Sequence, residues 1–246
     1  MPILRGILGV AIIITIAWLL SSDRKRVNWR TVACGLGIQL VLAALVLEAD
    51  WFEGAMGFFS ALVVKVLGFS TEGAAFVFGS LVENTDQFGF IFCFQVLPMI
   101  IFVSALTSVL YYLGVLQKIV VGFAWLMTRA MRLSGAESLS AAANVFVGQT
   151  EAPLVVRPYI PKMSRSEIMA LMTGGFATIA GSVLGAYILF LGGEDEALKA
   201  YYTKLLLCAS LMNAPAALIV AKLLVPETEK VTTDLNIARE DEGTNV

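Results

Sequence analysis

A polar stretch between two apolar arms, Asn144–Pro153, constrains the fold of this chain more than any other feature. The arms, residues 139–147 and 152–160, are too short to cross a membrane separately. Even about 11 helical residues, slightly more than either arm holds, rise only about 16 Å, half of a ~30 Å hydrocarbon core. Gly148 followed by Pro153 argues against one continuous helix through both arms. The sequence therefore predicts two short segments that meet at a turn.

This turn carries polar groups that a membrane tolerates only in a protected place. A carboxylate at the bilayer centre is costly, so Glu151 at that depth needs a function. Irregular backbone there survives only where it is buried in protein or lines a water-filled cavity. We therefore predict a re-entrant helical hairpin over residues 137–163, with Gln149, Thr150 and Glu151 at its tip. An amphipathic surface helix with a polar kink is the alternative interpretation.

The composition supports a membrane setting and excludes several classes of function. Hydrophobic residues make up 58% of the 246 residues and charged residues 15%, unlike ordinary soluble proteins. A net charge of −2 without long basic blocks excludes a nucleic-acid partner. The absence of histidine removes histidine-based catalysis and histidine-ligated metals. Cys34, Cys93 and Cys208 lie far apart in apolar runs, so we expect packing roles for them and no bound cofactor.

Apolar runs divide the chain into the helices of an all-α, polytopic membrane protein. About five runs are predicted to span the membrane, at residues 3–20, 32–47, 88–112, 168–191 and 200–224. Two further helices are predicted to lie in the membrane interface, at residues 52–69 and 115–132. The elements group into a scaffold region, 1–112, a gate or transport region, 113–224, and a polar tail, 225–246.

The distribution of basic residues predicts the orientation. The first loop is basic over Asp23–Arg30, which places it in the cytoplasm and the N-terminus outside. Both ends of the hairpin are also basic, with Arg132 before it and Lys162 and Arg165 after it. The two ends therefore lie on the cytoplasmic side, and the segment re-enters the membrane without crossing it. We expect a multi-pass protein of the plasma or inner membrane with a cytoplasmic tail.

The span after the hairpin contains an unusually small and polar run, Thr173–Ser182. The span begins at Ser164–Glu167, which matches a helix capping box. Gly181 and Gly185 form a G-x-x-x-G pattern that is common at packed helix interfaces. Thr178, however, lies at about the depth of the hairpin tip. A re-entrant hairpin beside an interrupted helix is typical of secondary transporters.

In such transporters free carbonyls and hydroxyls hold a cation, and polar side chains hold the solute near the midplane. An all-oxygen pocket for a hard monovalent cation is predicted from Asn144, the carbonyl of Val147, Thr178 and the carbonyl of Ile179. Gln149 offers hydrogen-bond donors and acceptors, whereas an ionised Glu151 offers acceptors only. These groups suit a neutral polar solute such as a base or a sugar.

Five runs of this chain closely resemble the concentrative nucleoside transporters, in the same order and over nearly the whole chain. They are Gly73–Gly79, Phe94–Pro98, Ser134–Ser138, Gly148–Pro153 and Gly175–Gly181. The Gly-Gln-Thr-Glu-Ala-Pro run is highly specific. The resemblance implies one half of an inverted-repeat transporter embedded in the lipid bilayer, with a nucleoside as substrate.

The resemblance also implies roles for particular residues. The nucleobase would be bound at Gly148, Gln149, Thr150 and Glu151, with Val183 against the base. A sodium site would be formed by Asn144, Val147, Thr178 and Ile179. Proton-coupled members depart from the pattern at the position of Asn144, so the asparagine here favours Na⁺ over H⁺ as the coupling ion. The purine or pyrimidine preference does not follow from these residues.

One departure from the family pattern is large. Members carry a second, inverted repeat with a trimer-forming scaffold helix, a second hairpin and two helices that bind the ribose. This chain stops before them, so we expect an N-terminal fragment of a sodium–nucleoside symporter that is inactive alone and lacks the helix supporting the family's trimer. A membrane subunit that associates with a full-length transporter is the main alternative. A channel is another, while an enzyme is disfavoured because no nucleophile–base pair accompanies Glu151.

Overall fold

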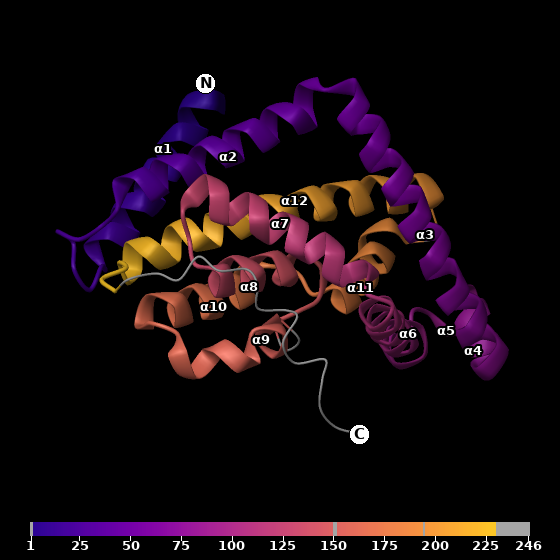
Figure 1. Ribbon diagram of the computed structural model, residues 1–246. Helices are drawn as coiled ribbons and strands as arrows, with labels where there is room; N and C mark the ends of the chain where they lie inside the picture. Colours follow the sequence, from indigo (N-terminus) through magenta and orange to yellow (C-terminus); the bar gives the residue numbers. More distant parts are fainter. Residues whose placement is uncertain (1, 150–151, 194, 230–246) are drawn as a thin grey trace.

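The computed structural model describes residues 2–149, 152–193 and 195–229, and within them every regular element is helical (Figure 1). In chain order the elements are α1 (Pro2–Leu19), α2 (Trp29–Glu48), α3 (Asp50–Phe78), α4 (Ser80–Glu83), α5 (Thr85–Phe88), α6 (Phe92–Tyr112), α7 (Val115–Met131), α8 (Gly135–Phe146), α9 (Ala152–Val155), the 3₁₀ helix η1 (Arg157–Lys162), α10 (Arg165–Ala177), α11 (Gly181–Gly192) and α12 (Glu196–Leu224). This all-helical architecture confirms the predicted fold class.

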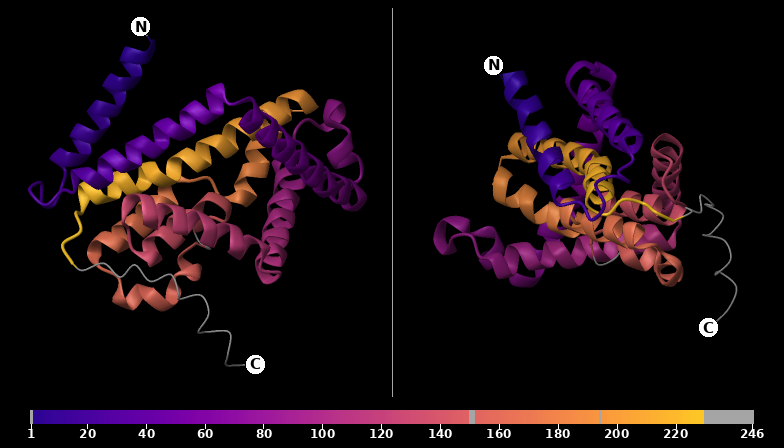
Figure 2. Two further views of the ribbon diagram at one scale, coloured as in Figure 1. Left: turned by 45° about the horizontal axis from the view of Figure 1, so that its top comes forward. Right: turned by 90° about the vertical axis from the view of Figure 1, so that its left-hand side faces the viewer.

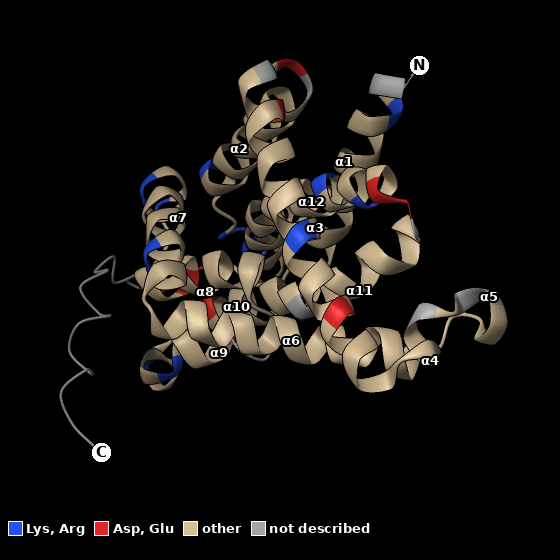
Figure 3. Cartoon of the chain, turned by 90° about the vertical axis from the view of Figure 1, so that its right-hand side faces the viewer, with Lys and Arg blue, Asp and Glu red and all other residues tan. Residues whose placement is uncertain are grey.

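Four helices are long and apolar enough to cross a membrane by length and composition: α2, α3, α6 and α12. α1 and α11 carry shorter apolar segments, Leu4–Leu19 and Val183–Gly192. Figure 3 shows that most of the ribbon bears no charged residue, while α7 carries several basic ones. Long uncharged helical surfaces are what a bilayer requires of the residues that face it.

The predicted helix over residues 52–69 is part of a longer element. α3 runs from Asp50 to Phe78, 29 residues, so its predicted end at residue 69 is wrong. Only Ala49 separates α3 from α2, and the chain turns sharply there (Figure 1). The helix ends at Gly79, whose φ of 56° lies in the region that glycine adopts most readily. Its placement in the outer interface stays a prediction.

Glycine and one unusual arginine set the bounds of the next two helices. The span predicted from residue 88 begins at Phe92, because Gly89 has a φ of 70° that an α-helix does not allow. α7 starts after Gly114, which has a φ of 73°, and ends at Met131, directly before Arg132, which has a φ of 55°. Arg132 is the one non-glycine residue with positive φ among the described residues, and it turns the chain from α7 into the hairpin.

The predicted hairpin has two unequal arms. The first arm is α8, a regular helix that begins at a capping box of Ser134 and Glu137. The second is the single turn of α9 followed by the 3₁₀ helix η1, where Pro158 and Pro161 interrupt α-helical hydrogen bonding. The capping box predicted at Ser164 is confirmed and begins α10. Figure 1 places α9 and η1 beside α8 and α10.

The span predicted over residues 168–191 is two helices and not one. α10 ends at Ala177 and α11 begins at Gly181, with extended backbone at Thr178 and Ala180 between them. The interruption falls inside the small-residue run, as the transporter interpretation predicted. It leaves the last carbonyls of α10 and the first N–H groups of α11 without partners in their own helices.

α12 forms the centre of the fold. It contacts α1, α2, α3, α8, α10 and α11, and Figures 1 and 2 show it running the length of the molecule beside α2. Its second half is buried around Leu218, Ala221 and Leu223. α8 is buried on nearly all sides between α7, α10 and α12, whereas α1 stands at the edge (Figure 2). The core therefore holds the first hairpin arm rigidly.

Candidate functional site

The end of the first hairpin arm meets the start of the second half of the broken helix. A Cβ atom added to Gly181 would lie 2.5 Å from the carbonyl oxygen of Phe146, so only glycine permits this approach. Phe146 is the last residue of α8, and Gly181 is the first of α11. The negative end of one helix dipole therefore faces the positive end of another at the break.

Asn144 lies two residues before the end of α8, beside this junction, and its side-chain amide has no partner among the described residues. Its side chain is 1% exposed, and among the residues that the structure describes neither Oδ1 nor Nδ2 has a hydrogen-bond partner. A Cβ atom on Gly174 of α10 would come within 3.0 Å of Nδ2, so the amide lies directly against α10. Because leaving a buried amide without partners is costly, a polar ligand or a water is expected to bind at this position.

Thr178 stands in the break with its hydroxyl already oriented. Oγ1 donates to the carbonyl oxygen of Gly174 at 2.9 Å, which leaves the oxygen lone pairs free to accept or to ligate. Ile179 lies in the same break, half-buried, and Val147 is the buried C-cap residue of α8. The structure thus brings the two segments that carry the four predicted cation ligands side by side.

Three of the predicted solute-binding residues are described by the structure, two at the hairpin tip and one at the start of α11. Gln149 is exposed. A Cβ atom added to Gly175 of α10 would lie 3.1 Å from the Cβ atom of Gln149, so Gln149 packs closely against α10. Gly148 is buried, and its carbonyl accepts from the N–H of Ala152 at 2.9 Å, which closes the turn. Val183 is 37% exposed on the first turn of α11. Thr150 and Glu151 lie outside the described residues.

A cavity of about 320 Å³ adjoins the junction on the side of α6. Both hairpin arms, the start of α11 and the second half of α6 form its walls. Its lining residues are Ser104, Thr107, Ser108, Tyr111, Phe146, Val147, Leu154, Val155 and Gly181. Of the predicted site residues that the structure describes, only Val147 lines it. The hydroxyl groups of α6 were not predicted, although their i, i+3, i+4, i+7 spacing within an apolar span would have revealed them.

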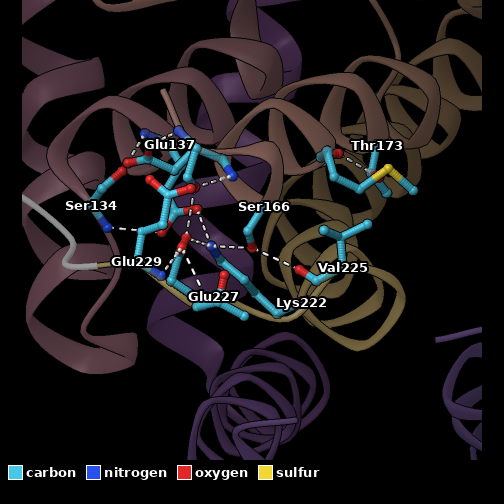
Figure 4. A network of polar contacts seen from close by, with 12 residues as sticks. Ser134, Glu137, Ser166, Thr173, Lys222, Val225, Glu227 and Glu229 are labelled. Atoms are coloured by element: carbon cyan, nitrogen blue, oxygen red, sulfur yellow. Dashed lines mark hydrogen bonds and ion pairs between the residues drawn. The ribbon is translucent and has the colours of Figure 1, made fainter. Parts of the chain in front are cut away.

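A second polar cluster, also not predicted, lies at the other end of α8 (Figure 4). Lys222 of α12 places Nζ 2.7 Å from Oε2 of Glu137, with side-chain exposures of 6% and 0%. The same Nζ lies 3.1 Å from Glu227 and donates to Ser166 at 2.9 Å. This Lys222 cluster joins the first turns of α8 and α10 to the last turn of α12.

Glu227 belongs to this cluster but lies just beyond α12. Burial raises the pKa of its carboxyl, but Lys222, the N–H of Glu229 and the hydroxyl of Ser164 outweigh burial and hold the pKa below its usual value. The Ser164 hydroxyl donates to it at 3.0 Å, and Ser166 donates to the carbonyl of Val225 at 2.7 Å. The chain after α12 is therefore anchored against the start of α10.

Two family models match the chain in succession. The model described as the Na⁺ dependent nucleoside transporter N-terminus matches residues 8–81. The model described as nucleoside recognition, named Gate, matches residues 93–194. The second match contains the hairpin, the broken helix and all nine predicted site residues.

Curated relatives cover nearly the whole chain. An uncharacterized transporter of Haemophilus influenzae is 47% identical over 94% of this chain and 54% of its own length. Solute carrier family 28 member 3 of Rattus norvegicus is 45% identical, over 96% of this chain and 31% of its own length. Sodium/nucleoside cotransporter 1 of the same organism is 44% identical, over 90% of this chain and 32% of its own length. The chain thus spans between about 31% and 54% of the length of these relatives, which are transporters and not enzymes.

Solved structures give the same family. CNTnw in an inward-facing, substrate-bound state matches with a TM-score of 0.87 at 46% identity, over 95% of this chain and 55% of that one. A CNTnw variant in an outward-facing state also matches with a TM-score of 0.87 at 45% identity, over 98% of this chain and 56% of that one. The chain therefore belongs to the concentrative nucleoside transporter family and corresponds to the N-terminal part of its members.

Proposed function

We propose that this chain supplies the sodium site and the base-binding hairpin of a sodium-coupled nucleoside symporter. The observation that carries the proposal is Asn144, which is buried at the helix junction and whose two polar side-chain atoms have no partner within the described part of the chain. Its carbonyl oxygen, the Thr178 hydroxyl and the carbonyls of Val147 and Ile179 are neutral oxygen donors of the kind that hold Na⁺ in broken-helix transporters. The negative end of the α8 dipole adds attraction for a cation.

Sodium is favoured over a proton because of the chemistry of the same groups. An asparagine amide, a threonine hydroxyl and two backbone carbonyls do not titrate near neutral pH, so none of them carries a coupling proton. Each offers lone pairs that ligate a hard cation. In this proposal Na⁺ binding between α8 and the α10–α11 break holds the hairpin against the broken helix and so completes the solute site.

The solute in this proposal is a nucleoside held at the hairpin tip. Gln149 presents donors and acceptors and lies against Gly175 of α10. Thr150 and Glu151 complete the polar set, and Val183 supplies an apolar surface on α11 for the flat face of a base. Sodium-coupled nucleoside transport is the property that the printed names of several relatives carry.

The proposed setting is a multi-pass membrane protein with its N-terminus outside and its tail in the cytoplasm. The basic loop between α1 and α2 and the basic residues flanking the hairpin support this orientation by the positive-inside rule. Assembly into a homo-oligomer, a trimer by analogy with the family, belongs to the same proposal.

Transport by the 246-residue chain alone is not expected. Inverted-repeat transporters form their site between two repeats, and every predicted site residue here comes from one hairpin and one broken helix. We therefore expect no sodium-driven uridine uptake by proteoliposomes that contain only this chain. Uptake in that assay would contradict the expectation that the chain is inactive by itself. Tight co-purification with a full-length transporter, without uridine or sodium binding by this chain, would favour a role as a subunit.

The Glu151→Gln variant tests the solute site by binding. In saturation-transfer NMR, we expect the chain in nanodiscs to bind uridine weakly in NaCl and Glu151→Gln to bind at least about tenfold more weakly, because a charged acceptor is lost. Glu196→Gln at the exposed start of α12 is the matched control and should leave binding unchanged. Equal uridine affinities of the wild type and Glu151→Gln would show that Glu151 does not contribute to solute binding.

A further inference from the structure

Helix α7 has an exposed face that neither the hairpin nor the proposed sodium site uses. Its opposite face is an apolar stripe that is buried and packs mainly against α8, with Leu116, Val120, Ala124, Met127 and Met131 at helical spacing. The exposed face combines apolar with basic side chains. α7 is not among the described helices that are long and apolar enough to cross a membrane. A helix of this kind is typical of the membrane interface, where it lies along the surface without crossing.

The charged side chains of α7 are all basic. Lys118 lies in its first turn, Arg129 in its last turn and Arg132 directly after it, and all three are exposed. The helix contains no aspartate or glutamate. Within the part of the chain that the structure describes, none of these three residues forms an ion pair with a carboxylate. The exposed face of α7 therefore offers positive charge for a negatively charged partner.

An open hollow of about 310 Å³ lies on the same face. It is lined by the apolar side chains of Ile119, Phe123 and Leu126, with Lys118 at one end. Gly122 leaves the hollow open, because this residue has no side chain and a Cβ atom there would have no neighbouring heavy atom within 4 Å. The face thus places a cationic group directly beside an apolar depression.

These two properties together select an amphiphilic ligand. An anionic phospholipid has a phosphate that suits the ammonium of Lys118 and an acyl chain that suits the apolar hollow. Trp125 lies on the same face and is 58% exposed, and tryptophan is enriched at the headgroup level of membranes. A second copy of the chain fits this face less well, because packing α7 against α7 would bring the basic residues of both helices together, and like charges repel.

We propose that the exposed face of α7 binds an anionic phospholipid, with Lys118 at the phosphate and an acyl chain in the hollow over Gly122. Arg129 and Arg132 add positive charge at the other end of the face. The proposed orientation puts α7 on the cytoplasmic side, where anionic lipids of a bilayer attract basic segments. The inference rests on the proposed membrane position of α7 and is independent of which ion and solute bind. Because α7 packs on α8, the lipid binds directly behind the first hairpin arm.

Quenching of Trp125 by brominated lipids tests the proposal. Trp18, Trp29 and Trp51 are replaced by phenylalanine in the full chain, so that Trp125 is its single tryptophan. The protein is placed in phosphatidylcholine vesicles in KCl, with about a tenth of the lipid exchanged for dibrominated phosphatidylglycerol or dibrominated phosphatidylcholine. We expect phosphatidylglycerol to associate with the face about fivefold more strongly, the factor that one basic residue contributes at an anionic surface.

Two outcomes of this measurement would overturn the proposal. Equal quenching by the two brominated lipids would show that the face meets the bilayer but selects no anionic lipid. Quenching by neither lipid would show that protein covers the face, as in an assembly of several copies of the chain.

Lys118→Gln should reduce the preference for phosphatidylglycerol to nearly none. Lys25→Gln is the matched control, because Lys25 is exposed in the basic loop between α1 and α2 and its replacement removes the same charge. That loop lies at the other end of the molecule from the start of α7 (Figure 1), so the preference should persist. An unchanged preference in Lys118→Gln, or an equal loss in both variants, would contradict a headgroup contact at Lys118.

Native mass spectrometry of the chain with all its tryptophans supplies a second readout. The wild type is expected to retain phosphatidylglycerol after phosphatidylcholine has been lost. Gly122→Leu fills the hollow without a clash and keeps Lys118, so retention of phosphatidylglycerol should fall several-fold. Retention equal to that of the wild type would show that no acyl chain occupies the hollow and would overturn the proposed site.

Discussion

Replacing Lys222 with methionine is expected to lower the free energy of unfolding by about 3 to 5 kcal/mol, the usual cost of breaking a buried ion pair from one side. The substitution keeps most of the side-chain volume but leaves the carboxylate of Glu137, 0% exposed, without the ammonium that neutralises it. The hydroxyl of Ser166 and the carboxylate of Glu227 lose the same partner. Unfolding of the purified chain in detergent, followed by helical circular dichroism, measures the change.

Two further variants control this experiment. Adding Glu137→Gln to Lys222→Met removes the uncompensated charge, so the double variant should recover part of the lost stability. Lys204→Met breaks the ion pair of Lys204 with Glu53, whose side chains are 29% and 65% exposed, and should lower the stability far less than Lys222→Met because solvent screens the pair. Similar losses for Lys222→Met and Lys204→Met would show that the buried Lys222 cluster does not anchor the helices.

Gly181→Ala is expected to disrupt the helix junction. The added methyl would sit 2.5 Å from the backbone carbonyl oxygen of Phe146, and a carbonyl at the end of a buried helix cannot move aside as a flexible side chain can. We expect a loss of about 1 to 3 kcal/mol from overpacking, together with weaker sodium binding because α11 is pushed away from α8. Thermal unfolding in NaCl and in choline chloride measures both effects.

Gly122→Ala is the matched control for Gly181→Ala. Gly122 is exposed within α7, and a Cβ atom there would have no heavy atom within 4 Å. Alanine favours helix over glycine by about 1 kcal/mol, so this variant should be neutral or slightly stabilising. A Gly181→Ala protein as stable as Gly122→Ala, with unchanged sodium dependence, would contradict the close approach of the two helix ends.

The sequence alone could predict the hairpin and the broken helix because each is a local consequence of chain chemistry. Two arms too short for the bilayer, a Gly–Pro interruption and a small-residue run are all visible in consecutive residues. The capping box at Ser164 is equally local, and it formed as predicted. The end of α3 at Phe78 does not follow from the apolar pattern, because the pattern is interrupted by the polar residues Ser70, Thr71 and Glu72, which the long helix nevertheless accommodates.

Contacts between segments that are distant in the sequence could not be predicted from local sequence patterns. Lys222 and Glu137 are separated by most of the gate region, and each by itself is an ordinary charged residue near a helix end. Their pairing follows from the packing of α12 against α8, which no local pattern predicts. The hydroxyl groups of α6 were detectable by their spacing, but the cavity that they line depends on where the hairpin arms lie.

Sodium-dependent thermal stability of the chain tests the central claim most directly. A ligand that binds only the folded state stabilises it by about 2.7 kcal/mol at a concentration of 100 Kd, so sodium binding should raise Tm in NaCl relative to choline chloride at equal ionic strength. We predict that Asn144→Ala abolishes this difference, while Ser138→Ala, an equally buried change on α8, preserves it. Equal Tm values for the wild type in the two salts, or an unchanged sodium effect in Asn144→Ala, would contradict the proposed sodium site.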